Sequence, residues 1–128
     1  MSSKEFNLFI NKKILPFKKT IIVDPDKSMS IRSFLIGSIS KSKSIASNVL
    51  ESEDVLSTIS CLRKLGTKIK KLNNRTYIIH GKGLGSLFIK KNAHLKFNNS
   101  GTLARLLIGI LSTTPRIYVN ISGDHSLN

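Results

Sequence analysis

Residues 20–39 read TIIVDPDKSMSIRSFLIGSI, and this stretch decides the fold class. The β-branched run over residues 20–23 is typical of a strand, which Asp24 and Pro25 end. Beyond them the apolar residues switch to helical spacing. The residues on one face of this helix are Ile31, Phe34, Leu35 and Ile39. The stretch therefore predicts a strand followed by a helix that begins near Lys27.

Further elements lie on both sides of this stretch. Residues 6–10 alternate roughly and predict another strand, whereas residues 45–50 predict a short extended link. A second helix is expected to begin after Ser52, and Gly66 ends it as a left-handed terminator. The buried stripe of this helix consists of Val55, Ile59 and Leu62.

The C-terminal half predicts a hairpin, a helix and a strand. Residues 67–72 and 76–79 alternate around an Asn-rich turn at 73–75, which indicates a β-hairpin. The third helix spans residues 102–112, and its inward side chains are Leu103, Leu106, Leu107, Ile110 and Leu111. A last strand follows through Ile117, Val119 and Ile121. The predicted order is β, β, α, α, β, β, α, β, which is an α+β unit.

The 128 residues suffice for one core and exclude two full domains. Lys and Arg total 21 against 7 Asp and Glu, so an anionic partner or substrate is expected, although A/T-rich coding would also enrich lysine. No apolar run approaches the roughly 18 residues that span a bilayer, and no secretory signal is present, so we expect a soluble intracellular protein. A single cysteine and scattered histidines predict neither a disulfide nor a metal site.

A polar cluster at residues 26–32 is the first candidate site. Free backbone N–H groups at a helix start bind anions, and Lys27, Ser28 and Arg32 add an ammonium, a hydroxyl and a guanidinium group. This cluster would fit a phosphate together with a carboxylate. A capped surface helix with solvated cations would explain the same residues.

A second polar cluster covers residues 98–105. Gly101 lets a ligand approach the backbone, while Asn99 and Thr102 can donate hydrogen bonds. The alternative is a plain turn and cap with Arg105 on a solvated face. The glycine-rich residues 81–85 lack the full phosphate-binding fingerprint and are interpreted as a connecting loop.

Four sequence blocks carry a resemblance to a known family. They are Asp26-Lys27-Ser28-x-Ser30-x-Arg32, Ser52-Glu53-Asp54, Asn99-Ser100-Gly101-Thr102-x-x-Arg105-Leu106-Leu107 and Gly123-Asp124-x-Ser126-Leu127. In order and spacing they resemble the 5-enolpyruvylshikimate-3-phosphate synthases, or 3-phosphoshikimate 1-carboxyvinyltransferases. The resemblance covers nearly the whole chain but only about the first third of such an enzyme. Residues 1–128 are therefore expected to be a partial domain, truncated at the C-terminus.

The resemblance implies the enolpyruvyl transferase fold, in which βαβαββ modules form an inside-out α/β barrel. Only about the first module and part of the next would be present. It also implies transfer of the enolpyruvyl group of phosphoenolpyruvate to the 5-hydroxyl of shikimate 3-phosphate, with release of phosphate, on the route to chorismate and aromatic amino acids. We expect no cofactor, no nucleic-acid or membrane partner, and a monomeric full-length enzyme in the cytoplasm.

Roles for individual residues follow from the resemblance. Lys27 would contact both substrates, while Ser28 and Arg32 would hold shikimate 3-phosphate. Asn99 and Gly101 would present donors to phosphoenolpyruvate.

Thr102 and Arg105 would support the turn at residues 99–101. The family's acid–base groups fall outside these residues, so no catalytic residue is expected here and the isolated chain is expected to be inactive. Asp24-Pro25 stands where the family usually has Pro then Gly, so the turn before Lys27 is expected to differ in backbone shape. Gly101 favours a glyphosate-sensitive enzyme over a resistant one.

Two alternatives remain open from the sequence. UDP-N-acetylglucosamine enolpyruvyl transferases share the architecture but typically show Lys-Asn at the first block and lack Asn-Ser-Gly-Thr at the second. A small basic nucleic-acid-binding domain would need aromatic residues interleaved with a basic face. The 6 Phe and 2 Tyr of this chain mostly lie in apolar stripes instead.

Overall fold

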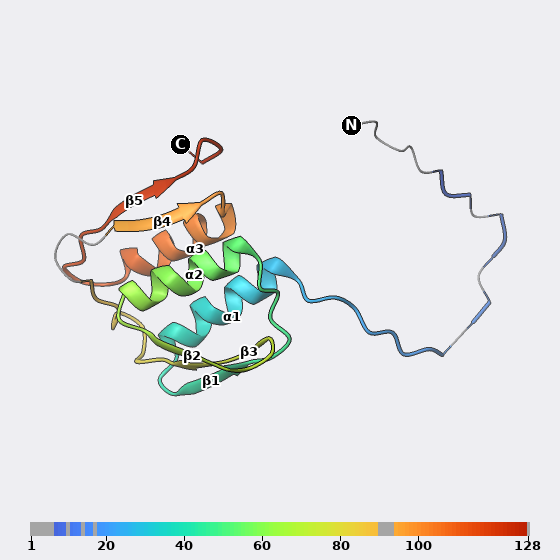
Figure 1. Cartoon of the computed structure of the whole chain (residues 1–128), viewed down its shortest axis with the longest axis horizontal. Coiled ribbons are helices and arrows are strands. Elements are labelled where there is room, and N and C mark those ends of the chain that lie inside the picture. The colour runs from blue at the N-terminus through green and yellow to red at the C-terminus, as the bar shows by residue number, and fades with distance from the viewer. Residues whose placement is uncertain (1–6, 10, 14, 17, 90–93, 128) are drawn as a thin grey trace.

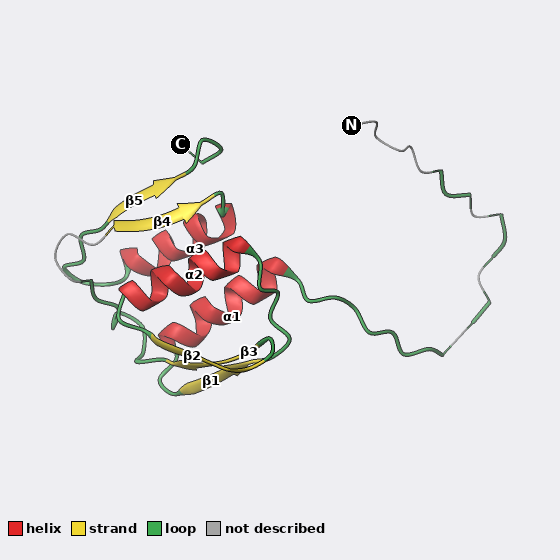
Figure 2. Ribbon diagram, in the orientation of Figure 1, coloured by secondary structure: helices red, strands yellow, loops and turns green. Residues whose placement is uncertain are grey.

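The computed structural model describes residues 7–9, 11–13, 15–16, 18–89 and 94–127. Figure 2 shows the helices and strands within these ranges. They are α1 (Lys27–Ile39), β1 (Lys43–Ala46), α2 (Glu53–Lys64), β2 (Lys68–Asn73), β3 (Thr76–His80), β4 (His94–Asn98), α3 (Gly101–Ser112) and β5 (Asn120–Gly123).

A layer of three helices lies between two small sheets (Figure 1). In the first sheet β1, β3 and β2 are antiparallel in that order, with Lys43 and Lys68 both opposite His80. Helix α1 packs against β1 and β3 of this sheet. In the second sheet β4 and β5 run parallel, joined through α3, and β4 packs against α2 and α3.

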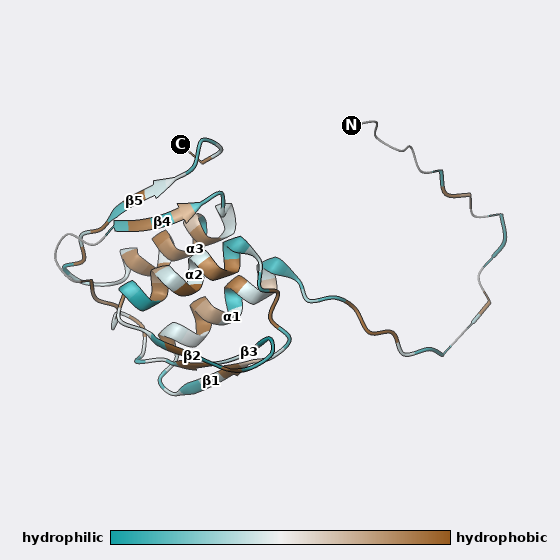
Figure 3. Cartoon of the chain, in the orientation of Figure 1, coloured by the Kyte–Doolittle hydropathy of each residue, from teal (hydrophilic) through white to brown (hydrophobic). Residues whose placement is uncertain are grey.

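Apolar residues of the three helices form much of the core, and Figure 3 shows brown, hydrophobic stretches on these helices. The predicted stripe of α2 is confirmed, since Val55, Ile59 and Leu62 are all buried. The stripe of α3 is narrower than predicted, because Leu106 is 38% exposed and Ile110 is only partly buried. The buried side chains of α3 are Leu103, Leu107 and Leu111.

The predicted helix ends are largely confirmed. The carboxylate of Asp26 accepts a hydrogen bond from the Met29 N–H at 2.6 Å, which caps α1 where the sequence places its start. Ser52 precedes α2 as predicted, but its side chain makes no capping hydrogen bond. Gly66 follows α2 with φ +86°, the left-handed conformation expected of a terminating glycine.

The hairpin of β2 and β3 is also confirmed, and it supports the loop that leads into α2. Arg75 in its turn has φ +54°. The Tyr77 hydroxyl donates to Glu51 at 2.5 Å, and Lys71 Nζ lies 2.6 Å from the same carboxylate. The Tyr77 ring packs edge-on against Phe34, with 5.3 Å between ring centroids. These contacts join the hairpin to α1 and to the residues before α2.

The two strands predicted at the N-terminus are wrong for the residues that the structure describes. Residues 7–9 and 20–23 form no strand, while Phe6 and Ile10 lie outside the described residues. Ile21, Ile22 and Val23 are 71%, 98% and 69% exposed. A strand needs hydrogen bonds to a neighbour, and this segment runs away from both sheets (Figure 1), so β propensity alone does not create one.

Other strands differ from the prediction in position. β1 begins at Lys43, two residues before the extended link predicted at 45–50, and β4 was not predicted at all. β5 begins at Asn120, so Ile117 and Val119 precede it. The observed order is α, β, α, β, β, β, α, β. Within the described ranges, no helix has the length and apolar character to cross a membrane.

Candidate functional site

The three helices begin at the same end of the helical layer (Figure 1). Their first residues are Lys27, Glu53 and Gly101. Each helix start leaves backbone N–H groups without intrahelical partners and carries the positive end of the helix dipole. We call this region, residues 26–32, 52–58 and 98–105, the helix-start end. It gathers the donors that the sequence assigned to two separate clusters.

Lys27 is held in place by a carboxylate from the next helix. Its Nζ lies 2.8 Å from Asp54 Oδ2, and the Asp54 side chain is only 9% exposed while that of Lys27 is 50% exposed. The carboxylate therefore fixes the ammonium group from the protein side. The exposed side of Lys27 remains open to an anion from solvent.

Arg32 lies one turn further along α1 and is exposed. In the part of the chain that the structure describes, it forms no ion pair, and its guanidinium only approaches the Met29 sulfur at 4.0 Å. Ser28 is partly buried beside Lys27. A guanidinium without a carboxylate partner can bind a planar anion through two parallel hydrogen bonds.

The start of α3 is open above its backbone. Ser100 is buried, and its hydroxyl accepts a hydrogen bond from the Leu103 N–H at 3.4 Å. A Cβ added to Gly101 would meet no atom within 4 Å, so the space over this helix start is free. Asn99 and Arg105 are exposed, and Thr102 is partly buried.

Asn98 joins the start of α3 to two other elements. Its side-chain Nδ2 donates to Ser57 Oγ of α2 at 2.7 Å. Its carbonyl accepts from the Asp124 N–H at 2.9 Å, which brings the turn after β5 to the helix-start end. The Asp124 carboxylate accepts from the backbone and hydroxyl of Ser126, and these hydrogen bonds lower the pKa of Asp124.

The structure brings the two predicted clusters to one end but does not bond them to each other. Among the described residues, no hydrogen bond or ion pair joins Lys27, Ser28 or Arg32 to the turn at 99–101. Both clusters connect instead to α2, through Asp54 and through Ser57.

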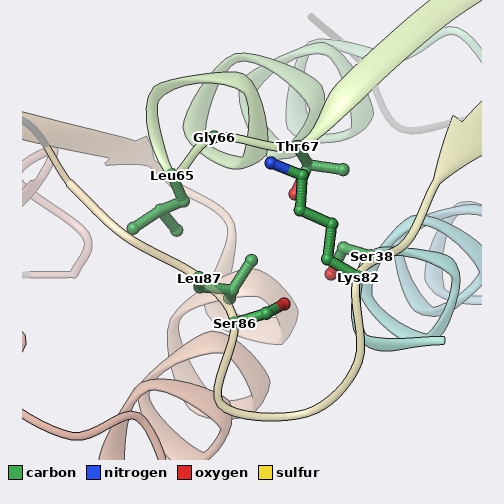
Figure 4. A pocket seen from close by; sticks show the side chains of 7 residues that line it. All are labelled: Ser38, Leu65, Gly66, Thr67, Lys82, Ser86 and Leu87. Carbon is green, nitrogen blue, oxygen red and sulfur yellow. The ribbon is translucent and has the colours of Figure 1, made fainter. Parts of the chain in front are cut away.

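Two hollows of the surface are not lined by Lys27, Ser28 or Arg32. One of about 480 Å³ lies between Val23 and the end of β1, and Asp26, Met29 and Ser30 of the helix-start end form part of its lining. Another, too narrow for a water molecule, is shown in Figure 4. It is lined by Ser38, Leu65, Gly66, Thr67, Lys82, Ser86 and Leu87.

Comparison with known proteins settles the family. Residues 11–128 match the family model described as EPSP synthase (3-phosphoshikimate 1-carboxyvinyltransferase). The chain belongs to the EPSP synthase family. The enolpyruvyl transferase type of α+β fold predicted from the sequence is confirmed, because solved EPSP synthases share this architecture with the chain.

Individual EPSP synthases match over most of this chain but a small part of their own. The 3-phosphoshikimate 1-carboxyvinyltransferase of Syntrophomonas wolfei subsp. wolfei is 40% identical over 119 residues, covering 93% of this chain and 27% of the relative. The protein of the same name from Bacillus cytotoxicus is 44% identical over 108 residues, covering 84% and 25%. The structure of EPSP synthase from Acinetobacter baumannii matches with a TM-score of 0.74 and 36% identity, covering 84% and 24%. The chain spans about a quarter of the length of these EPSP synthases.

Sequence reasoning placed Asp54 in one of the family-like blocks and Asn98 in the second polar cluster, but it predicted the contacts of neither and did not single out Ser57. Asp54 and Ser57 are buried polar residues within the buried side of α2, among Val55, Thr58 and Ile59. Polar residues inside an apolar stripe need partners. That rule could have marked both positions before the structure was known, although it could not have named their partners.

Cys61 and His80 are titratable groups outside the helix-start end whose pKa values are shifted by their surroundings. Burial raises the pKa of the Cys61 thiol to about 11, and its sulfur donates to the Lys96 carbonyl, so this thiol is unreactive at neutral pH. Desolvation, followed by the charges of Lys43, Lys68 and Lys70, lowers the pKa of His80. These cations lie on the first sheet, away from the start of α3.

Proposed function

We propose that the chain forms part of the substrate-binding half of a 3-phosphoshikimate 1-carboxyvinyltransferase. The whole enzyme transfers the enolpyruvyl group of phosphoenolpyruvate to the 5-hydroxyl of shikimate 3-phosphate and releases phosphate. The observation that carries the proposal is the joint position of two anion-ready helix starts, α1 and α3, in a member of the EPSP synthase family. As the resemblance implies, its partners are small molecules, and the full-length enzyme is a cytoplasmic monomer.

The chemistry of the substrates supports this proposal. Each substrate carries a phosphate and a carboxylate, and the reaction passes through a tetrahedral adduct that retains the phosphate. Fixed cations and backbone N–H groups stabilise such an adduct because they need no reorganisation as charge develops. The helix-start end offers both kinds of group on rigid elements.

Residues of α1 are assigned to shikimate 3-phosphate. Arg32 binds its carboxylate, because the guanidinium has no acidic partner among the residues described and matches a carboxylate in plane. Ser28 adds a hydroxyl donor. Lys27 contacts both substrates, since Asp54 holds its ammonium at the protein side while its other side remains exposed.

Residues at the start of α3 are assigned to phosphoenolpyruvate. The open space over Gly101 admits an anion to the positive end of the helix dipole, where the Gly101 N–H donates to the Asn99 carbonyl at 3.0 Å. Asn99 is exposed and adds a side-chain amide. Thr102 and Arg105 support the turn from the first helical turn behind it.

Ligand titration of the ¹⁵N-labelled chain tests this assignment. Shikimate 3-phosphate should shift the amide signals of residues 27–32, and phosphoenolpyruvate those of residues 27 and 99–105. Arg32→Gln should weaken shikimate 3-phosphate binding about tenfold, because a charged hydrogen-bonded pair contributes roughly 1.5–3 kcal/mol. Arg116→Gln, which removes an exposed arginine outside the helix-start end, is the matched control. Equal effects of the two variants, or shifts confined to other residues, would contradict the proposal.

A basic nucleic-acid-binding domain is less well supported. Phe34, Tyr77 and Phe97 are buried in the core and cannot stack on bases, whereas Phe9, Phe88 and Tyr118 are exposed. Binding to nucleic acid with a steep salt dependence would favour this alternative. Tighter binding of shikimate 3-phosphate in the presence of phosphoenolpyruvate would exclude it, because only a shared substrate site couples the two ligands.

A further inference from the structure

Two buried side chains of α2 face the two halves of the proposed site. Asp54 and Ser57 are 6% and 8% exposed and lie three residues apart, which places them on one side of the helix. Asp54 contacts Lys27 of α1, and Ser57 contacts Asn98 just before α3. A single turn of α2 thus holds a contact to each half.

The contact on the α3 side fixes an unusual backbone position. Asn98 has φ +51°, the left-handed conformation that side chains other than glycine, asparagine and aspartate adopt with difficulty. Its amide is anchored to Ser57, and its carbonyl is anchored by the Asp124 N–H. The direction in which the chain leaves Asn98 determines where residues 99–101 lie, so these anchors determine the position of the turn.

Helices move as rigid bodies, so the spacing between the starts of α1 and α3 depends on what joins them. No described hydrogen bond or ion pair joins Lys27 to the turn at 99–101, whereas each of them reaches α2 by one short contact. Helices α1 and α3 also pack against each other, so the core fixes the helices themselves. Asp54 and Ser57 then fix the Lys27 ammonium and the turn at 99–101 relative to α2. A ligand that touches both halves requires the ammonium and the turn to be correctly spaced.

We propose that α2 aligns the two halves of the site, with Asp54 as the positioning residue for Lys27 and with Ser57, through Asn98, as the positioning residue for the turn at 99–101. This inference rests on the proposed function for the identity of the ligands. Neither side chain needs to touch a substrate. Their effect is to keep the ammonium of Lys27 and the backbone N–H groups of α3 at a fixed separation.

Amide hydrogen exchange of the unliganded chain tests the alignment without any substrate. Ser57→Ala should speed exchange of the amides of residues 99–103 about fivefold relative to wild type, as expected for loss of one neutral hydrogen bond. Ser57→Thr keeps the hydroxyl and should restore the wild-type rates. Ser60→Ala, on the exposed side of α2, is the matched control and should change none of them. Unchanged exchange in Ser57→Ala, or equal acceleration throughout the hairpin of β2 and β3, would overturn the proposal.

A second variant removes the same contact from the other partner. Asn98→Gly keeps the left-handed backbone accessible and deletes the amide, so it avoids the strain that other side chains would introduce. Its exchange pattern should match that of Ser57→Ala, and the double variant should be no faster than either single variant. Additive acceleration would show that the two side chains act separately and would contradict the proposed alignment.

Phosphoenolpyruvate titration then separates this proposal from the proposed function. In Ser57→Ala the affinity for phosphoenolpyruvate should fall about fivefold, while inorganic phosphate, which is too small to reach both halves, should bind as in wild type. If wild type binds no phosphoenolpyruvate but the exchange pattern is as expected, the proposed function fails and the alignment stands. If wild type binds it and Ser57→Ala shows wild-type exchange and affinity, the alignment fails and the proposed function stands.

Discussion

Some residues at the helix-start end make side-chain contacts within the protein, and others are accessible to solvent. Asp54 contacts Lys27 of α1 and Ser57 contacts Asn98 of β4, whereas Arg32 is exposed and Gly101 is only partly buried. Arg32 and Gly101 were recognisable in the sequence, because a cationic or glycine-containing helix start follows from local spacing. The partners of Asp54 and Ser57 were not recognisable, because they lie 27 and 41 positions away along the chain.

Gly101→Ala separates folding from ligand binding at one position. The added methyl group meets no protein atom within 4 Å, and alanine is a better helix former than glycine, so the free energy of unfolding should not fall. The same methyl group occupies the space assigned to phosphoenolpyruvate, so phosphoenolpyruvate and glyphosate should both bind at least about tenfold more weakly. Denaturant unfolding and calorimetric titration measure the two effects. Unchanged affinity for both ligands would place phosphoenolpyruvate elsewhere.

The phenol of Tyr77 gives the stability a defined dependence on alkaline pH. Burial, and next its hydrogen bond to Glu51, raise the pKa of Tyr77 to about 12 from its ordinary value of 10. Folding thus favours the neutral phenol, and this stabilisation is complete below pH 10 and is lost as the pH rises towards 12. Tyr77→Phe should therefore be less stable than wild type by about 1 kcal/mol at pH 8, with the difference shrinking and then reversing between pH 10 and 12. Urea unfolding of both proteins across this range measures it, and a constant difference would refute it.

Among the elements, those with strong local signals were predicted and those that depend on distant partners were not. All three helices and the β2–β3 hairpin follow from periodicity, caps and turn residues. β1 and β4 were missed because Lys43–Ala46 and His94–Asn98 are rich in polar residues, and they become strands through pairing with β3 and β5. Residues 20–23 show the converse, because they have a strong β propensity but pair with no strand of the described structure.

The two residues that precede α1 and α2 should respond differently to alanine substitution. Asp26 caps α1 through the Met29 N–H, so Asp26→Ala should lower the free energy of unfolding by about 1 kcal/mol. The buried hydroxyl of Ser52 has no hydrogen-bond partner in the described structure, so Ser52→Ala should leave stability unchanged or slightly raised. Thermal unfolding of the two variants checks this contrast. A larger loss for Ser52→Ala would show that its hydroxyl is bonded in solution.

At the scale of the whole molecule, the three helices run in a common direction (Figure 1). This direction, more than the order of the helices along the chain, brings their starts to one end. Three helix starts lie at one end, and the buried carboxylate placed there, Asp54, is paired with Lys27. The sequence supported two such starts. It could not show that α1 packs against both α2 and α3, because that follows from packing rather than from any local motif.

The exposed apolar segment before α1 predicts self-association. Ile21, Ile22 and Val23 are all more than two-thirds exposed and adjacent in sequence. Sedimentation of the chain should therefore show association that increases with concentration. Ile21→Ser combined with Ile22→Ser should reduce it without altering the circular dichroism of the folded part. Equal association of the variant would locate the contact surface elsewhere, such as the partly exposed side of α3.

The parallel pairing of β4 with β5 has a consequence for the order of folding. Antiparallel β2 and β3 close through a two-residue turn, whereas β5 can meet β4 only after all of α3 has formed and crossed over. Contacts between residues distant in sequence form late, because closing the longer loop costs more chain entropy before the contact stabilises the fold. Pulse-labelling during refolding should thus protect the hairpin amides before those of residues 120–123. Protection in the reverse order would indicate that nucleation starts at the C-terminal sheet.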